Sequence, residues 1–211
     1  MGKVEMGYVC VTTDEGEKKY YKTEREEWDK GTLTVTTDGK SWGLIDQDGV
    51  ELCELKYDSI QYFWRGYAKV SLNGKEGWID RNGKEICPVK YDRVDWYHNG
   101  FAPVMLDGVF GFVDESGKEI CKIKYDAVLA FDKGYAAVKL AGKWGVINED
   151  GKEVIPPIYE DTEPLKDGFF VVKQHGKWGS VCENGEMLCV IDCESIAEAE
   201  VMSRRILRDR K

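Results

Sequence analysis

The stretch Gly142–Glu153, with the sequence GKWGVINEDGKE, decides the fold because it recurs along most of the chain. Two of its glycines, Gly145 and Gly151, return at fixed steps of 34 residues. The two series are Gly43, Gly77, Gly111, Gly145, Gly179 and Gly49, Gly83, Gly117, Gly151, Gly185. A tyrosine follows in phase at Tyr57, Tyr91, Tyr125 and Tyr159. A fixed period of this length identifies a tandem repeat.

Each copy consists of short β-prone segments separated by Asn-Gly, Asp-Gly or Ser-Gly pairs. In the third copy these segments are 101–106, 110–114, 118–121 and 125–131. The glycine pairs supply the positive φ angles that tight hairpin turns require. Four short strands in each copy predict a β-meander, and the repeated glycines are therefore read as backbone geometry and not as a phosphate-binding loop.

The sequence divides into three parts. Residues 1–30 are interpreted as a degenerate N-terminal capping repeat, with strands expected at Tyr8–Thr13 and Lys19–Thr23 on either side of a turn. This segment could cap the array or complete its last sheet. Residues 31–194 hold five β-repeats, and residues 195–211 form a different, C-terminal segment.

The C-terminal segment has the pattern of a helix. Ser195-Ile196-Ala197-Glu198 is a capping box, in which a serine hydroxyl and a glutamate cap the first turn. Ala199, Met202 and Ile206 fall on one helical face. We expect a short amphipathic helix that either docks on the body or projects from it.

The motif Lys143-Trp144-Gly145, followed by Asp150-Gly151-Lys152 and by Tyr159, resembles the WG repeat of bacterial proteins. Two copies depart from it, with Glu76 and Phe110 in place of the tryptophan. An aromatic residue two places later, Trp78 or Phe112, could fill that slot from the same strand face. In the last copy Cys193 replaces the tyrosine, which leaves the pairing of the final strand open. The resemblance implies a repeat scaffold and supplies no catalytic residues to transfer.

These observations predict an all-β fold of tandem four-strand meanders. A meander of this size is close to a propeller blade, so five copies could close into a propeller-like ring. An open, twisted β-array with capped ends is the alternative.

The net charge of −9 disfavours nucleic acid and anionic membranes as partners and suits a basic protein partner. The start of the chain lacks the apolar core of a signal peptide, so a cytoplasmic location is expected. Four cysteines, Cys53, Cys87, Cys121 and Cys189, share one repeat position with Ile155. A position that accepts cysteine or isoleucine is typical of a buried apolar slot, so we expect reduced thiols.

The candidate binding residues lie where the copies diverge, between the tyrosine and the next glycine. One position in this divergent segment stays apolar in every copy. It lies three residues before the next repeat glycine, is predicted to be core, and is occupied by Phe63, Tyr97, Phe131 and Leu165. The neighbouring residues form an aromatic and basic set: Tyr62, Trp64, Arg65, Trp96 and His98. Tryptophan, tyrosine and arginine are the side chains that dominate protein interfaces.

We therefore expect a non-catalytic scaffold that binds a protein partner through this set. Glycan binding is the first alternative, because the same rings could stack on sugars. An immunity or inhibitor role against a basic toxin is the third. The plain structural alternative is that Trp64 and Trp96 only pack between repeats.

Other clusters favour structural roles. Asp58, Asp92 and Asp126 follow the repeat tyrosines and are expected to accept backbone hydrogen bonds. The segment 46–49 is expected to be a hairpin turn, because it lacks the further acidic ligands of a calcium loop. Cys182, Cys189, Cys193 and His175 are the one zinc set considered, and their spacing lacks a paired Cys-x-x-Cys element. No catalytic motif is present, so we expect no enzyme activity, no metal and no cofactor.

Overall fold

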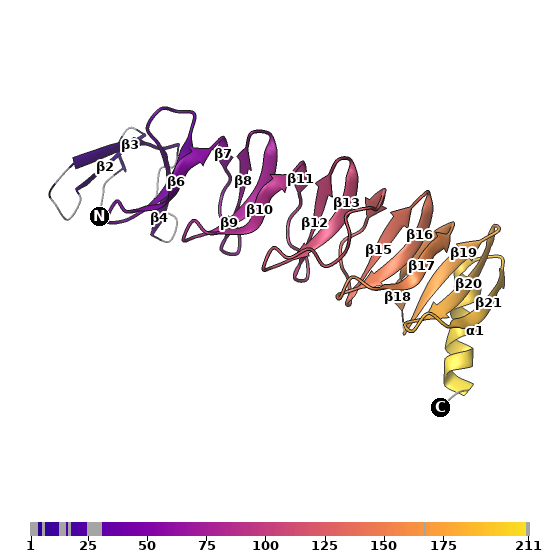
Figure 1. The fold of residues 1–211 in the computed structure, drawn as a ribbon. Helices are drawn as coiled ribbons and strands as arrows, with labels where there is room; N and C mark the ends of the chain where they lie inside the picture. The colour runs from indigo at the N-terminus through magenta and orange to yellow at the C-terminus, as the bar shows by residue number, and fades with distance from the viewer. Residues whose placement is uncertain are drawn as a thin grey trace. The chain divides into compact units, whose positions relative to one another are not determined.

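The computed structural model describes residues 4–5, 7–12, 16, 18–24, 31–166 and 168–209. The chain divides into two compact units, residues 1–94 and residues 95–211. Both are built from antiparallel sheets whose strands follow the order of the sequence (Figure 1).

The first unit holds two sheets and the short strand that ends it. The first sheet, in the order β1 to β6, consists of β1 (Val4–Glu5), β2 (Tyr8–Thr12), β3 (Lys18–Lys22), β4 (Thr32–Thr36), β5 (Trp42–Asp46) and β6 (Glu51–Tyr57). The second sheet consists of β7 (Ser59–Ile60), β8 (Tyr67–Leu72), β9 (Lys75–Asp80) and β10 (Glu85–Tyr91), and β11 (Arg93–Val94) follows it.

The second unit holds three sheets and the C-terminal helix. The third sheet contains β12 (Phe101–Leu106) and β13 (Val109–Asp114). The fourth contains β14 (Ala127–Val128), β15 (Tyr135–Leu140), β16 (Lys143–Asn148) and β17 (Glu153–Tyr159). The fifth contains β18 (Asp161–Lys166), β19 (Phe169–Gln174), β20 (Lys177–Cys182) and β21 (Met187–Cys193), and α1 (Ile196–Asp209) follows.

The predicted all-β fold of four-strand meanders with a short C-terminal helix is confirmed. The second, fourth and fifth sheets each contain four strands in meander order. The third copy differs, because the segment after β13 forms only the isolated bridges Val113–Glu119 and Phe110–Tyr125 in place of a regular fourth strand. In the last copy Cys193 pairs with Trp178, as Tyr159 pairs with Trp144, so the loss of the tyrosine leaves the pairing of the final strand unchanged.

The N-terminal strands β2 and β3 confirm the two predicted strands and extend the first sheet. Lys22 pairs with Thr36 of β4. Tyr21 donates its hydroxyl hydrogen to Glu51 Oε1 at 3.2 Å, and burial together with that carboxylate raises the pKa of Tyr21 to about 12. The segment therefore caps the first sheet. Most of the expected turn between the strands lies outside the described residues.

Hairpin turns have the backbone that the glycine pairs predict. Ala141 and Gly142 have φ angles of 49° and 77°, so both central residues of that two-residue turn are left-handed. The segment 46–49 is a turn, as predicted: Asp46 Oδ1 accepts the amide hydrogens of Asp48 and Val50, and Gly49 has φ 83°.

One glycine of each copy also lets neighbouring sheets approach closely. A Cβ added to Gly151 would lie 1.9 Å from the carbonyl oxygen of Ile120, and one added to Gly83 would lie 2.4 Å from that of Leu52. No side chain fits at such distances, so this position is glycine for steric reasons as well as for its positive φ.

A polar contact joins successive copies through the repeat tyrosine, and we call it the tyrosine clamp. In the first unit, Tyr57 Oη donates to Glu85 Oε1 at 3.1 Å, and Lys56 Nζ lies 3.3 Å from the same oxygen. In the second unit, Tyr125 Oη and Lys124 Nζ lie 3.0 and 2.8 Å from Glu153 Oε1. The hydrogen bond and charge of Lys124 hold the pKa of Glu153 below its usual value, while burial and Glu153 raise the pKa of Tyr125.

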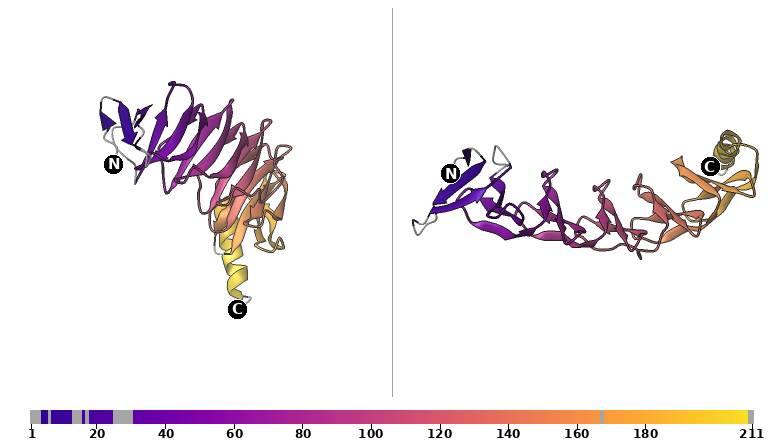
Figure 2. Two further views of the ribbon diagram at one scale, coloured as in Figure 1. Left: turned by 60° about the vertical axis from the view of Figure 1, so that its left-hand side comes forward. Right: turned by 90° about the horizontal axis from the view of Figure 1, so that it is seen from above.

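Helix α1 docks on the fifth sheet, which answers the question that the sequence left open (Figure 2). Ser195 Oγ accepts the amide hydrogen of Glu198, as the predicted capping box requires. The Glu198 carboxylate accepts the amide hydrogen of Glu194, one residue before the Ser195 amide that a capping box would use. Ala199 is fully buried.

The prediction that Ala199, Met202 and Ile206 form the apolar face of the helix is partly wrong. Met202 is 43% exposed, and the buried neighbour on the docking face is Ser203. The Ser203 hydroxyl lies 2.6 Å from Ser180 Oγ and also donates to the carbonyl oxygen of Ala199. The helix is therefore held by a buried polar pair inside a small apolar cluster, which a count of apolar periodicity does not detect.

Candidate functional site

The candidate binding residues lie on, or just before, the two-residue turns that enter each new hairpin. In the first unit, Trp64 and Tyr67 exchange two backbone hydrogen bonds of 2.8 and 3.0 Å. Arg65 and Gly66 between them have φ angles of 51° and 94°. Positive φ at both central residues fixes a tight turn and places the Arg65 side chain at its tip.

The chain alternates before this turn, so that aromatic side chains leave the body. Tyr62 is 74% exposed and Trp64 is 49% exposed, whereas Phe63 between them is half-buried, with the Arg81 guanidinium 4.8 Å from its ring centre. The Arg65 guanidinium lies 4.5 Å from the centre of the Trp64 ring. Tyr62, Trp64 and Arg65 thus form one exposed aromatic and cationic patch, which we call the Trp64 patch.

The corresponding loop of the second unit carries Trp96, which is 45% exposed, and His98. Two side chains fix this loop to the next one. His98 Nδ1 lies 3.1 Å from the carbonyl oxygen of Phe131, and Asn99 Nδ2 donates to that oxygen at 2.8 Å. His98 therefore has a structural contact, and Trp96 is the exposed aromatic of this loop.

Trp64 and Trp96 are therefore only partly covered by the neighbouring residues. The predicted core position of the same loops is only partly correct: Phe131 is 1% exposed, whereas Phe63 and Tyr97 are half-buried. Tyr97 donates its hydroxyl hydrogen to the carbonyl oxygen of Asp114 at 3.2 Å. The side chain of Leu165 lies outside the described residues.

The five predicted residues fall into two groups, one in each unit. Tyr62, Trp64 and Arg65 are brought together in the first unit, and Trp96 and His98 share a loop in the second.

The acidic residues after the repeat tyrosines support turns, as predicted for Asp58 and Asp126. Asp58 Oδ2 accepts the amide hydrogen of Asn73 at 2.6 Å, and Asp126 Oδ2 accepts that of Gly142 at 3.1 Å. Asp92 forms an ion pair with Lys75 Nζ at 2.5 Å. In the fourth copy Glu160 accepts the amide hydrogens of His175 and Gly176, and these bonds lower its pKa.

All seven cysteines are free thiols. Cys87 and Cys189 are buried in the shared slot, while Cys53 and Cys121 are half-buried. Burial raises the pKa of Cys53 to about 11, which keeps that thiol protonated and unreactive at neutral pH.

The zinc set considered from the sequence is only partly brought together. The Sγ atoms of Cys189 and Cys193 lie 4.0 Å apart in the cluster under α1. Within the described ranges, no group of three histidine, cysteine or acidic residues has the geometry to hold a metal ion. In the same residues, no helix is long and apolar enough to cross a membrane.

The sequence comparison identifies the repeat. The family described as the WG containing repeat matches residues 42–75, 77–109, 110–144 and 144–178, which is more than half of the chain. The chain belongs to the WG-repeat family. No curated protein matches this WG-repeat chain.

Several solved structures resemble this WG-repeat protein at low similarity. Hsv2p of Kluyveromyces lactis matches with 17% identity and a TM-score of 0.38, over 77% of this chain and 61% of that one. BamB of Moraxella catarrhalis matches with 9% identity and a TM-score of 0.34, over 91% and 72%. The computationally designed Ika4 matches with 16% identity and a TM-score of 0.36, over 59% and 91%. The WG-repeat chain thus spans 61% of the length of Hsv2p, and these similarities transfer no function to it.

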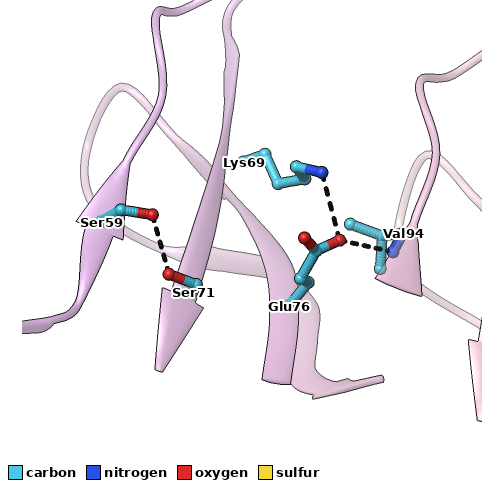
Figure 3. Close-up of polar contacts among 5 residues, drawn as sticks. All are labelled: Ser59, Lys69, Ser71, Glu76 and Val94. Carbon is cyan, nitrogen blue, oxygen red and sulfur yellow. Dashed lines mark hydrogen bonds and ion pairs between the residues drawn. The ribbon is translucent and has the colours of Figure 1, made fainter. Parts of the chain in front are cut away.

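The departures from the WG motif change the chemistry of that slot. Glu76 replaces the tryptophan in the second sheet, and its Oε2 atom accepts from Lys69 Nζ at 3.1 Å and from the Val94 amide at 2.9 Å (Figure 3). Beside it, the Ser59 and Ser71 hydroxyls lie 2.7 Å apart. Trp78, two places later on the same strand, is fully buried.

Sequence reasoning missed one feature of the second unit, a cavity beside the Phe131 loop. Its signal in the sequence is the loss of two aromatic residues in one copy: Val146 stands where Trp78 and Phe112 stand, and Ala130 where Tyr62 and Trp96 stand.

Proposed function

We propose that this WG-repeat protein is a non-catalytic scaffold that binds a protein partner through its irregular loops. The observation that carries the proposal is the exposure of large aromatic rings in the loops before the hairpin turns: Tyr62 at 74%, Trp64 at 49% and Trp96 at 45%. Exposed tryptophan costs solvation free energy, and buried tryptophan, tyrosine and arginine supply most of the binding energy of protein interfaces.

Electrostatics favour a basic partner. The protein carries a formal net charge of −9. Such a charge raises the association rate of cationic proteins and repels nucleic acids.

The Trp64 patch favours protein over glycan. Sugar rings bind by stacking on a free aromatic face, whereas the Arg65 guanidinium lies over the Trp64 ring at 4.5 Å. A rigid arginine–tryptophan pair is instead a common centre of protein interfaces. Glycan binding is therefore the outcome to test second.

The experiment is an affinity capture from the native host with tagged wild type and four variants. Trp64→Ala tests the first unit, Trp96→Ala the second, and the double variant both. Tyr20→Ala removes a tyrosine that is 64% exposed on β3, outside these loops, and is the matched control. Circular dichroism confirms that each variant is folded.

We expect wild type and Tyr20→Ala to retain one and the same protein. The affinity of the double variant for that protein should be lower by at least about tenfold. Equal retention by the double variant would place the interface elsewhere. If no specific protein is retained, and wild type binds saturably to an oligosaccharide array whereas Trp64→Ala does not, glycan binding replaces the proposal.

A further inference from the structure

The cavity in the second unit lies between the fourth and fifth sheets and measures about 90 Å³. It is lined by Leu129, Ala130, Asp132, Tyr135, Ala137, Val146, Thr162, Glu163 and Phe170. Ala130 and Asp132 occupy the same repeat positions as Tyr62 and Trp64 of the Trp64 patch. The cavity therefore lies at the counterpart, one copy further on, of the loops that carry Trp64 and Trp96.

The cavity exists because one copy has lost its aromatic filling. One junction earlier, the Phe131 ring packs against Phe101 at 4.3 Å and against Phe112 at 4.9 Å, measured between ring centres. At the next junction Val146 replaces the equivalent of Phe112. The Phe170 ring packs edge-on against Tyr135 at 5.1 Å and forms a wall.

The cavity has an apolar floor and an exposed mouth. Val146 and Phe170 are 2% and 1% exposed, whereas Leu129, at 53%, and Asp132 are open to solvent. An apolar cavity of roughly 150 Å³ can hold a benzene ring. A volume of about 90 Å³ therefore suits one unbranched alkyl chain better than a ring.

Three polar groups line the same cavity and determine which chemical group the bound alkyl chain can carry at its end. The Asp132 and Glu163 carboxylates have no ion-pair partner among the described residues. The Thr162 hydroxyl oxygen is buried and has no hydrogen-bond partner in that part of the chain. Two carboxylates and an orphan hydroxyl favour a cation that donates hydrogen bonds.

We propose that this cavity binds the side chain of a lysine on the protein partner. The four methylene groups lie against the apolar side chains of the cavity, and the ammonium group pairs with the two carboxylates. A single flexible point charge matches a narrow apolar channel better than the broad planar guanidinium of arginine. The inference extends the proposed function by naming the residue that the partner inserts.

The first test uses a short acetylated Gly-Lys-Gly amide peptide and the same peptide with norleucine, which keeps the four side-chain carbons and lacks the ammonium group. Methyl resonances of Leu129 and Val146 report binding. We expect saturable shifts with the lysine peptide, about 3- to 5-fold tighter than with norleucine. In the double variant Asp132→Asn/Glu163→Gln the two peptides should bind alike.

Val146→Phe restores the ring of the earlier copy and should abolish both sets of shifts. Ala130→Trp changes an exposed position and serves as the second blocking variant if Val146→Phe does not fold. Equal binding of the two peptides to wild type, or unchanged lysine binding in both blocking variants, would overturn the inference. Binding of n-butylammonium without binding of the lysine peptide would assign the cavity to a free amine and overturn it too.

Affinity capture separates this inference from the proposed function. A partner retained by wild type and lost with Val146→Phe or Ala130→Trp supports both. A partner retained equally by the blocking variants but lost with Trp64→Ala/Trp96→Ala overturns the cavity alone. Lysine-peptide binding without any captured protein would overturn the proposed function while leaving the chemistry of the cavity intact.

Discussion

Two junctions in the second unit solve the same problem with different chemistry. Between the third and fourth sheets, Lys124 and Tyr125 share the Glu153 carboxylate, at 2.8 and 3.0 Å. Between the fourth and fifth sheets, Ile158 stands in the lysine position and Met187 in the glutamate position, so the tyrosine clamp is absent. Tyr159 is 6% exposed, and burial alone raises its pKa.

The second of these junctions is held mainly by apolar contacts and by one peripheral hydrogen bond. Val146, Ile155, Tyr159, Phe170, Val172 and Val181 form its buried cluster. Tyr135 donates its hydroxyl hydrogen to Glu183 Oε2 at 3.2 Å. The cavity lies at this junction. The comparison teaches that glycine spacing preserves the backbone, while the side chains between sheets are free to change and to leave room for a ligand.

The largest difference between the junctions should come from their glycines. Gly151→Ala would place a methyl group 1.9 Å from the Ile120 carbonyl oxygen, with φ 72°. We expect a loss of about 3 kcal/mol or more in the free energy of unfolding, from overpacking together with left-handed strain. Gly185→Ala, 2.8 Å from the Val154 carbonyl oxygen, should cost less.

Gly142→Ala is the control for these two variants, since it has a similar φ and no heavy atom within 4 Å. It should cost about 1 kcal/mol, from strain alone. Urea unfolding followed by tryptophan fluorescence measures all three. Equal losses for Gly151→Ala and Gly142→Ala would show that the close approach of the sheets has no energetic consequence.

The tyrosine clamp should account for the next difference. Tyr125→Phe removes a hydrogen bond to a partly exposed carboxylate and should lower the free energy of unfolding by about 1–2 kcal/mol. Tyr159→Phe removes a hydroxyl that has no side-chain partner among the described residues, so its effect should be within about 0.5 kcal/mol of zero. Losses of equal size in the two variants would contradict the clamp.

The acid response should distinguish the junctions further. The folded-state pKa of Glu153 is lowered from 4.5 by the hydrogen bond and charge of Lys124, so its contribution is present above pH 4.5 and is lost as the pH falls through the lower, folded value. Wild type should therefore be more stable than Glu153→Gln at pH 7, and the difference should shrink below pH 4.5. Urea unfolding between pH 3 and pH 7 measures this difference in the free energy of unfolding. A difference that stays constant with pH would show that the ion pair with Lys124 does not stabilise the protein.

The smallest effect is a gain. Met187→Glu together with Ile158→Lys rebuilds the clamp at the unclamped junction and should stabilise the protein by less than about 1 kcal/mol, because exposed ion pairs contribute little. Thermal unfolding in low and high salt checks it, since the gain should decrease with salt. Met187→Gln is the uncharged control. A larger gain in high salt than in low salt would show that the lysine and glutamate do not pair.

The parts of the fold that follow local rules could be predicted from the sequence. Gly142 and Gly49 marked turns because their positive φ depends on only a few neighbouring residues. The Ser195 cap and the turn-supporting roles of Asp58 and Asp126 are equally local. The reduced fourth strand of the third copy could not be predicted, because its residues keep the repeat pattern and differ only in how they pair.

The candidate site could be predicted only in part for the same reason. The departure of Tyr62, Trp64 and Trp96 from the repeat pattern singled them out in the sequence, and the structure adds that they are exposed. The contact of His98 with the Phe131 carbonyl joins residues 33 positions apart, and local sequence does not specify it. The cavity depends on the combined volumes of Ala130, Val146 and Phe170, which become informative only once the sheets are stacked.

Helix α1 has a consequence for how long such an array can grow. A sixth copy would have to pack on the apolar residues of the fifth sheet, such as Trp178 and Cys189, and α1 already occupies them together with the Ser180 hydroxyl. The helix therefore covers the apolar face of the fifth sheet against which a further copy or a second molecule could pack. Deleting residues 195–211 should expose this face and promote self-association of the protein.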